Sequence, residues 1–318
     1  MGSDMATLAP PRSGRMRPGP ATDSSARREG WRRRLPLSPA LLLMILVTQI
    51  PFLFTIAFSF ESWNLVRPGS RHWVGLSNYA GVFTDSAFRD ALVTEIELTL
   101  LAVVISMVLG IGLAVLLDRK FPGRGIVRTL LIAPFLIMPT VAGLLWKTTM
   151  LDPVYGIVNY LLRELGFAPV DFVSRFPMSS VVTVLVWQWT PFMMLLVLAG
   201  LQSQSYDVLE AARVDGAGAW TTFRAITLPH LRSYIELGVL LGAIYLVNTF
   251  DVIYMTTQGG PGTATTNLPY YLYQRAFLGF DVGQASALGV VTVAGTILVA
   301  TVALRTLFTV FSASEGND

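Results

Sequence analysis

Few side chains in this sequence could carry out catalysis. Cysteine is absent and the two histidines, His72 and His230, lie far apart, so neither thiolate chemistry nor a metal-ligand cluster is indicated. Lysine occurs only at Lys120 and Lys147, and neither completes a P-loop, whose lysine contacts the β- and γ-phosphates of ATP. The sequence therefore indicates neither an enzyme with a resident cofactor nor a P-loop ATPase.

The chemistry that remains is hydrogen bonding by polar residues inside long apolar runs. Tyr245, Asn248 and Asp251 recur at i, i+3 and i+6, which places them on one face of a helix. Such a polar stripe is one way to line a solute pathway. Asn and Tyr can also bond neighbouring helices together, and Asp251 can reach the interface or cap a helix, so packing is the alternative interpretation.

A second stretch combines aromatic and amide groups in Trp187-Gln188-Trp189-Thr190-Pro191. Because consecutive residues of a helix point in different directions, at most one indole can face a pathway. The alternative is that both pack beside a kink at Pro191. Pro134 and Pro139 predict bends in the preceding apolar run.

The composition indicates the elements that must position these residues. Of 318 residues, 53% are hydrophobic and only 14% are charged, against about 25% charged in soluble domains. Continuous apolar runs, not the alternation of barrel strands, predict an all-α integral membrane protein. Six spans are expected, at about residues 37–60, 98–117, 129–147, 178–201, 234–255 and 282–304.

These spans define a membrane domain over residues 35–311, with tails at 1–34 and 312–318. The first span is too long for a signal peptide and lacks a cleavage site, so it is expected to remain. Lys and Arg concentrate in residues 1–34 and 118–128, which predicts a multi-pass protein with both termini in the cytoplasm. The tail is interpreted as a disordered, lipid-headgroup anchor in preference to a nucleic-acid-binding arm.

The loop at residues 202–233 is expected to form two short helices. Asp207 is a candidate N-cap, Gly216 and Gly218 are expected at positive φ in a turn, and Pro229 is expected to end the second helix. Trp220, Phe223 and Ile226 lie at helical spacing, so that helix has an apolar stripe. The residues alone leave two interpretations open, a docking surface for a partner or an amphipathic hairpin on the headgroups.

This loop resembles the EAA motif of ABC-importer permease subunits, in particular sugar permeases of the maltose and glycerol-phosphate type. The resemblance covers roughly residues 37–308, and one departure is Ser233, where family members often have proline. Outside the loop the similar motifs are Phe250-Asp251, Thr257-Gln258-Gly259-Gly260-Pro261, Tyr273-x-x-x-Phe277 and Gly283-x-Ala285-x-Ala287. Within it, the residues that match and are expected to couple to an ATPase are Glu210, Ala211, Ala212, Asp215, Gly216, Ala217, Phe223, Ile226, Leu228 and Pro229.

The resemblance implies a type I importer permease in the bacterial inner membrane. Its loop would sit as a coupling helix in a groove of a separate ATP-binding subunit, present as a dimer that uses ATP and Mg²⁺. Glu210 would offer a carboxylate to that subunit, Ala211 and Ala212 would allow close approach, and Gly216 would fix the turn. A second homologous permease and an extracytoplasmic substrate-binding protein would complete the importer, so this chain is expected not to be an enzyme.

The resemblance also implies a sugar or sugar alcohol as cargo, with polyols the closest match and disaccharides next. Indole faces stack on sugar rings and an amide bonds two hydroxyls, so the candidate pathway residues are Gln188, Trp189, Tyr245, Asn248 and Asp251. Gly259, Gly260 and Pro261 are placed in an extracytoplasmic loop. The alternatives are a stand-alone secondary transporter or channel, and a membrane anchor that would leave the polar stripe without a role.

Overall fold

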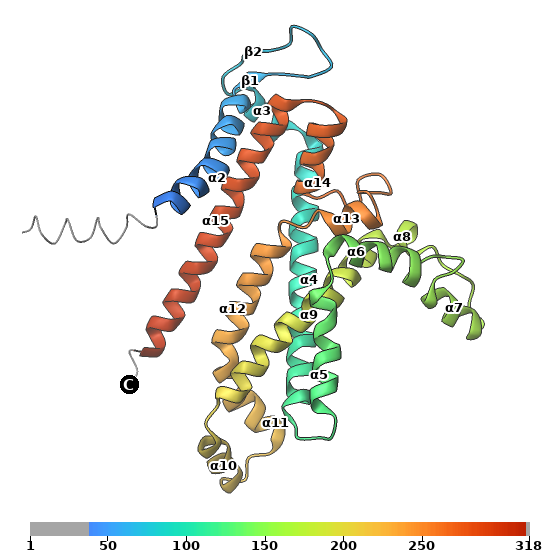
Figure 1. The fold of residues 1–318 in the computed structure, drawn as a ribbon. Helices are drawn as coiled ribbons and strands as arrows, with labels where there is room; N and C mark the ends of the chain where they lie inside the picture. The colour runs from blue at the N-terminus through green and yellow to red at the C-terminus, as the bar shows by residue number, and fades with distance from the viewer. Residues whose placement is uncertain (1–37, 316–318) are drawn as a thin grey trace, which may run out of the picture. The chain divides into compact units, whose positions relative to one another are not determined.

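The computed structural model describes residues 38–315 and is almost entirely helical (Figure 1). The predicted tail at residues 1–34 and the last three residues lie outside the described residues. The long helices are α2 (Ser38–Ser59), α4 (Ser86–Asp118), α9 (Pro177–Ser203), α12 (Leu228–Leu246) and α15 (Val282–Glu315). The chain divides into a segment up to Phe54, which is helical from Ser38, and a second unit from Thr55 onward.

Shorter elements connect the long helices. They are β1 (Glu61–Ser62), β2 (His72–Trp73), α3 (Ser77–Thr84), α5 (Arg124–Ile132), η2 (Ala133–Leu136), α6 (Pro139–Leu145), η3 (Trp146–Met150), α7 (Ile157–Glu164), α8 (Phe172–Arg175), α10 (Tyr206–Val214), α11 (Ala219–Thr222), η4 (Phe223–Thr227), α13 (Asp251–Thr256), α14 (Leu268–Tyr273) and η5 (Gln274–Leu278). The two strands pair antiparallel, Glu61 opposite Trp73.

Three helices in the described part, α2, α4 and α9, are long and apolar enough to cross a membrane. A fourth crossing results if the two segments Arg124–Leu136 and Pro139–Met150, bent by 100°, count as one span. This bend confirms the one expected from Pro134 and Pro139, because proline lacks an N–H and disrupts the helix before it. The predicted fifth span is also broken, since α12 ends at Leu246 and α13 begins at Asp251.

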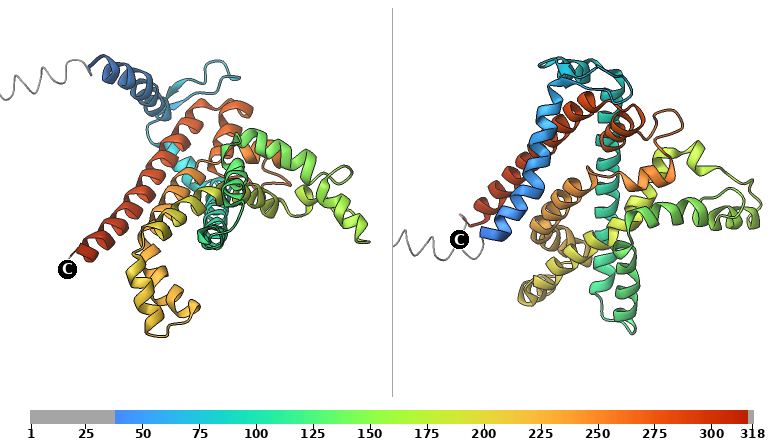
Figure 2. Two further views of the ribbon diagram at one scale, coloured as in Figure 1. Left: turned by 60° about the horizontal axis from the view of Figure 1, so that its bottom comes forward. Right: turned by 45° about the horizontal axis from the view of Figure 1, so that its top comes forward.

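The core of the second unit is built around the α4–α9 pair, with α12 packed against both (Figures 1 and 2). One cluster joins Leu98, Leu185 and Ile253; a second joins Met107, Met193 and Leu231. A third surrounds Leu288 near the start of α15, where it meets α3, α4 and α14. These clusters hold α9 and α12 in place, and α9 and α12 contain the candidate pathway residues Gln188, Trp189 and Tyr245. The helices α10 and α11 lie at one end of α12, and α13 and α14 lie at its other end (Figure 1).

Candidate functional site

The first helix of the 202–233 loop, α10, begins earlier than the sequence predicts. Ser205, in an extended conformation, is the N-cap and makes no side-chain cap hydrogen bond. Asp207 therefore lies in the first turn, and its prediction as N-cap is wrong because the chain leaves α9 in an extended conformation at Gln204 and enters the new helix at once. In the first turn the Asp207 carboxylate still interacts favourably with the helix dipole.

Gly216 closes α10 as expected. It has φ +78°, and the amides of Gly216 and Ala217 donate to the carbonyls of Arg213 and Ala212 at 3.1 and 2.9 Å. This pair of bonds is a Schellman motif, which satisfies the last carbonyls of a helix through a residue in the left-handed region. Gly218 has φ −69° at the N-cap of α11, so the positive φ predicted for it is wrong.

The second helix of the loop does not end at Pro229. The segments α11, η4 and α12 follow one another without a gap, and Pro229 lies in the first turn of α12. The segment η4 (Phe223–Thr227) is a π-type turn, which is wider than an α-helical turn. Because of this wider turn directly before Pro229, no helical hydrogen bond requires the N–H that proline lacks, so the helix continues. Ser233 accordingly lies within a continuous helix.

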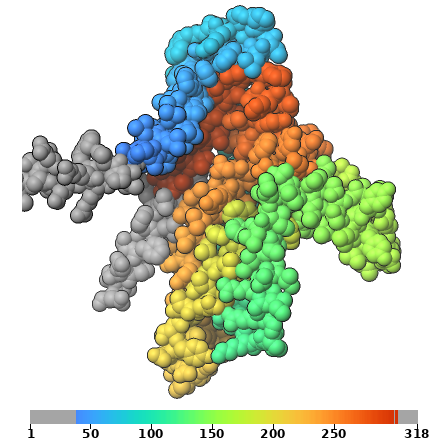
Figure 3. All heavy atoms as spheres, viewed as in Figure 1, coloured from blue at the N-terminus to red at the C-terminus, as the bar shows by residue number. Residues whose placement is uncertain are grey.

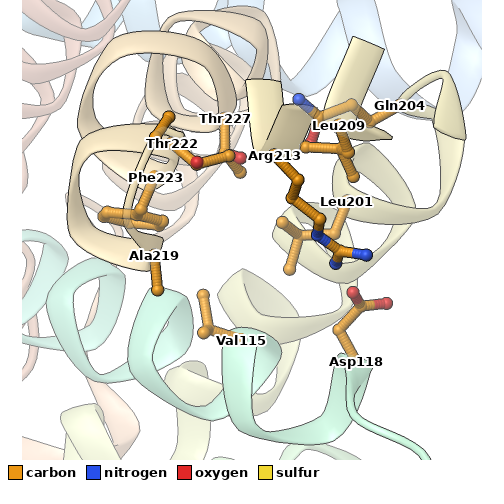
Figure 4. A pocket seen from close by; sticks show the side chains of 11 residues that line it. Val115, Asp118, Leu201, Gln204, Leu209, Arg213, Ala219, Thr222, Phe223 and Thr227 are labelled. Carbon is orange, nitrogen blue, oxygen red and sulfur yellow. The ribbon is translucent and has the colours of Figure 1, made fainter. Parts of the chain in front are cut away.

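The same π-type turn divides the predicted apolar stripe. The indole of Trp220 is 71% exposed and stacks on the Phe223 ring at 5.9 Å between centroids. Phe223 and the buried Thr227 instead face a groove of about 320 Å³ between this loop and the end of α4 (Figure 4). The groove is lined by Val115, Asp118, Leu201, Gln204, Leu209, Arg213, Ala217, Ala219, Thr222, Phe223 and Thr227.

The predicted coupling residues thus divide into an outer and an inner set. Glu210, Ala211 and Asp215 are exposed on the loop, which lies at the surface in gold at the lower end of Figure 3. Leu228 and Pro229 are also exposed, and Ile226 is half-buried. The inner set packs within the chain and comprises Ala212, Ala217 and Phe223. A partner can therefore reach the carboxylates of α10 directly, whereas the inner residues support its shape.

The predicted pathway residues Gln188, Trp189 and Tyr245 come together around one cavity of about 350 Å³. Its walls are mainly aromatic: the Trp189 ring lies 5.6 Å from Tyr245 and 5.7 Å from Phe135, measured between centroids. The remaining lining residues are Ile137, Pro139 and Phe192. Small-molecule pockets in proteins have this size and this mixture of apolar wall and few polar groups.

Gln188 is the polar group of this cavity. It is buried, and its Nε2 donates to the Ile137 carbonyl at 2.7 Å, a carbonyl that the break between η2 and α6 leaves without a helical partner. Its Oε1 has no hydrogen-bond partner among the described residues. A buried acceptor without a partner is costly, and this oxygen has less than 1 Å² of accessible surface, so a hydroxyl donor can reach it only if neighbouring side chains move.

The sequence did not identify Phe135, Ile137 or Phe192 as part of this site. The signal that could have found the first two is the pair of prolines that bends the chain around them, at 134 and 139. Trp187, in contrast, faces away from the cavity residues and packs against Trp146 at 5.7 Å between ring centroids. One indole only therefore lines the cavity, as the helical geometry predicts.

Asn248 and Asp251 lie beyond the α-helical part of the span that holds Tyr245. The backbone amides of Asn248 and Thr249 bond the carbonyls of Tyr245 and Leu246 in tighter turns after α12, and Asp251 begins the separate helix α13. The Asn248 amide donates back to the Ile244 carbonyl at 2.9 Å. Asp251 accepts from the Thr140 hydroxyl at 3.1 Å, which ties α13 to α6. Neither side chain lines the aromatic cavity.

The predicted Gly-Gly-Pro loop connects α13 to α14 and is closed on itself. Gly259, with φ +78°, accepts hydrogen bonds at its carbonyl from the Thr265 amide at 3.0 Å and the Thr266 hydroxyl at 3.3 Å. A Cβ on Gly259 would lie 2.5 Å from the Thr266 hydroxyl oxygen, so only glycine fits. Gly260 and Pro261 continue the loop; Pro261 is exposed.

Comparison with known proteins gives consistent results. A family model described as "Binding-protein-dependent transport system inner membrane component" matches residues 102–313. The probable ABC transporter permease protein y4oQ of Sinorhizobium fredii is 41% identical, over 81% of this chain and 86% of the relative. The sulfoquinovosyl glycerol transport system permease protein SmoG of Agrobacterium fabrum is 34% identical, over 86% and 90%. The fold is similar to that of a bacterial ABC transporter involved in the import of the acidic polysaccharide alginate, with a TM-score of 0.77 at 21% identity over 90% and 98% of the two chains.

Proposed function

Because the chain belongs to the family of binding-protein-dependent transport system inner membrane components, we propose that its cargo is a sugar or sugar alcohol. The chain is a multi-pass permease subunit of an ABC importer and not the ATPase, which is a separate subunit. A relative named for a sulfoquinovosyl glycerol supports the sugar assignment. Within sugars, a polyol is the first candidate and a disaccharide the second.

The observation that carries this proposal is the cavity lined by Gln188, Trp189 and Tyr245. The indole face of Trp189 offers an apolar surface to the C–H groups of a sugar ring or of an open-chain polyol, and the unpaired Oε1 of Gln188 accepts from a cargo hydroxyl once neighbouring side chains move aside. Since Nε2 is held by the Ile137 carbonyl, the orientation of that oxygen is set before cargo arrives. The cavity volume of about 350 Å³ is at the lower end of the range for small-molecule sites, which suits a solute of monosaccharide size, whether a ring or an open-chain polyol.

The same proposal assigns the 202–233 loop to energy coupling. In it, α10 and α11 dock on a dimer of ATP-binding subunits that use ATP and Mg²⁺, with the exposed Glu210 and Asp215 as anionic contacts. The Schellman turn at Gly216 keeps α10 at a fixed angle to α11. A second homologous permease faces the cavity, and an extracytoplasmic binding protein delivers the cargo on the side of residues 257–267.

The membrane arrangement follows from these assignments. The membrane domain covers residues 35–311, the 202–233 loop faces the cytoplasm, and both termini lie on that same side. Gly259, Gly260 and Pro261 then lie on the extracytoplasmic side.

The test of the cargo site compares Trp187 and Trp189, the two residues directly before and after Gln188. Trp189→Leu removes the stacking surface and is expected to raise the apparent KM for uptake about threefold to tenfold, since such contacts contribute about 0.5–1.5 kcal/mol. Trp187→Leu is the control, because Trp187 packs on Trp146 outside the cavity. Uptake of a panel of polyols and disaccharides is measured in cells and normalised to membrane abundance; equal apparent KM values in the two variants would exclude the cavity as the cargo site.

A further inference from the structure

The α4 helix is longer than a membrane crossing requires. Its 33 residues extend about 50 Å, against a hydrocarbon core of about 30 Å. The uncharged run begins at Leu98, so the turns at residues 86–97 project beyond it. Along these turns α4 packs against α14. Two acidic residues of α4, ten positions apart, bond this neighbour: Asp85, at the N-cap of α4, and Glu95.

Glu95 is a carboxyl group buried without a cation. Its side chain is almost inaccessible, at 2% exposure. Its Oε2 accepts the amide of Leu268, the first residue of α14, at 3.1 Å, and its Oε1 lies 3.5 Å from the Thr99 hydroxyl. Among residues 38–315 no Lys, Arg or His forms an ion pair with it. A buried acidic group is costly unless it is hydrogen-bonded, and an apolar residue of similar volume would leave the buried Leu268 amide without an acceptor. Glu95 is therefore the residue through which α4 is bonded to the start of α14.

Asn267 extends this contact to the broken fifth span. The residue is fully buried and is the N-cap of α14, where its Oδ1 accepts from the Tyr270 amide at 3.1 Å. Its side-chain amide donates to the Thr249 carbonyl at 2.6 Å, and its neighbour Leu268 donates to the Glu95 carboxylate. Thr249 lies in the break between α12 and α13. A chain of hydrogen bonds therefore runs from α4 through the start of α14 to the outer end of α12.

The inner end of α12 is the coupling loop. Residues 219–246 form one continuous helical rod through α11, η4 and α12. Ala219 and Leu246, the two ends of this rod, are about 40 Å apart at 1.5 Å per residue, and Thr249 follows three residues later. Tyr245, which lines the cavity, lies near the outer end of this rod.

We propose that Glu95 is a positioning residue of the transport cycle: through Leu268 and Asn267 it holds the break in the fifth span against α4, so that movement of the α12 rod is converted into movement of α14 and the 257–267 loop. This inference depends on the proposed coupling function of the 202–233 loop. Without the Glu95 contact, α12 moves but α14 does not follow, and ATP is hydrolysed without a matching movement of cargo.

The contact itself is tested by hydrogen exchange, which requires no cargo. In the assembled transporter in lipid nanodiscs, Glu95→Met keeps the side-chain volume and removes the acceptors, so exchange of amides at residues 265–271 is expected to become about tenfold faster. Glu97→Gln is the matched control, because Glu97 is exposed two positions along the same helix. Unchanged exchange at residues 265–271 in Glu95→Met would overturn the contact.

The positioning role is tested by the number of sugar molecules imported per ATP hydrolysed, measured in proteoliposomes with the binding protein. This ratio does not depend on protein abundance, so a merely structural role leaves it unchanged. We expect Glu95→Met to lower the ratio at least fivefold and Glu97→Gln to leave it at the wild-type value. If Glu95→Met does not assemble, Glu95→Gln replaces it. The glutamine keeps one acceptor oxygen, but its new NH₂ group faces the donors that bond the carboxylate, the Leu268 amide and the Thr99 hydroxyl. A smaller decrease in the ratio of sugar to ATP is therefore expected.

The outcomes separate the two proposals. A wild-type ratio in the Glu95 variants, with faster exchange, overturns the positioning role alone. Absence of sugar uptake by the wild-type protein overturns the proposed cargo and leaves the exchange result as the test of the contact.

Discussion

Gly216 determines the geometry of the turn between α10 and α11. It has φ +78°, whereas Gly218, two residues later, has φ −69°, and an added Cβ at either position meets no atom within 4 Å. The two glycines therefore differ in backbone conformation and not in available space. Only Gly216 occupies a region that costs an L-residue about 1–2 kcal/mol.

This difference gives a matched pair of variants. Gly216→Ala is expected to lower binding-protein-stimulated ATP hydrolysis by the assembled importer several-fold, because the strain of about 1–2 kcal/mol is relieved by reorienting α10. Gly218→Ala is expected to behave as wild type. The measurement is ATPase activity of purified complexes of equal subunit content; equal losses in both variants would contradict the assignment of Gly216 to the turn.

Asp85 is the acidic residue at the N-cap of α4. Its Oδ2 accepts from the Tyr271 hydroxyl and the Arg275 guanidinium, both at 2.5 Å, and its Oδ1 accepts from the Ala87 amide at 2.9 Å. Burial disfavours the ionised form, but the hydrogen bonds from Tyr271 and Ala87, together with Arg275, outweigh burial and hold the pKa of Asp85 below its usual 3.8. The folded state therefore favours the carboxylate.

The sign of the resulting pH dependence follows from linkage. Because the pKa of Asp85 is lowered on folding, its contribution is present above pH 3.8 and is lost as the pH falls below that value. Thermal unfolding of the detergent-solubilised chain should show Asp85→Asn less stable than wild type at pH 6, with the difference becoming smaller as the pH falls below 3.8. A difference in Tm that stays constant over that range would contradict the ion pair's role.

At the scale of the element, α4 and α9 approach each other closely at Gly110. An added Cβ there would lie 2.7 Å from the Met193 Cβ and 2.9 Å from the Met194 amide nitrogen, whereas one at Gly112 meets nothing within 4 Å. Helices in membranes associate through such small residues, which let backbones approach. The α4–α9 pair is the centre of the membrane unit, so this contact supports the whole cavity region.

The prediction for this pair uses the two glycines of α4. Gly110→Ala is expected to destabilise the chain by about 1–3 kcal/mol, because backbone atoms of α9 must shift. Gly112→Ala is expected to be neutral or to stabilise the helix by up to about 1 kcal/mol. Thermal unfolding in detergent measures both; a Gly110→Ala variant as stable as Gly112→Ala would show that α4 and α9 do not meet there.

The elements also show what the sequence could predict. Apolar runs and prolines predicted the helical class and the bend at residues 137–138, since both depend on local properties. The break at 247–250 could not be predicted, because it depends on the distant Asn267, which bonds the Thr249 carbonyl. The continuation of the helix through Pro229 could not be predicted either, because it depends on the π-type turn of η4. Likewise Gln188, Trp189 and Tyr245 were identified by type, whereas Phe135 and Phe192 were not, because ordinary apolar residues become site residues only through tertiary packing.

At the scale of the whole molecule, the orientation in the membrane is a prediction from the distribution of Lys and Arg. The chain has no cysteine, so single cysteines report accessibility without a background. Tyr155 and Val214 are strongly exposed and lie in connections predicted on opposite sides. In intact cells, Tyr155→Cys should react with an impermeant thiol reagent and Val214→Cys should not; the reverse pattern would show that the termini are extracytoplasmic.

The central claim is that this chain moves a sugar only when the 202–233 loop couples it to ATP hydrolysis by another subunit. The most direct test is uptake of radiolabelled sugar into proteoliposomes that contain the chain, its partner permease and the ATPase, with binding protein outside and ATP inside. Uptake should require both ATP and binding protein and should be abolished by Glu210→Lys, which reverses the exposed charge of α10. Uptake by the chain alone, driven by a proton or sodium gradient without ATP, would contradict the claim.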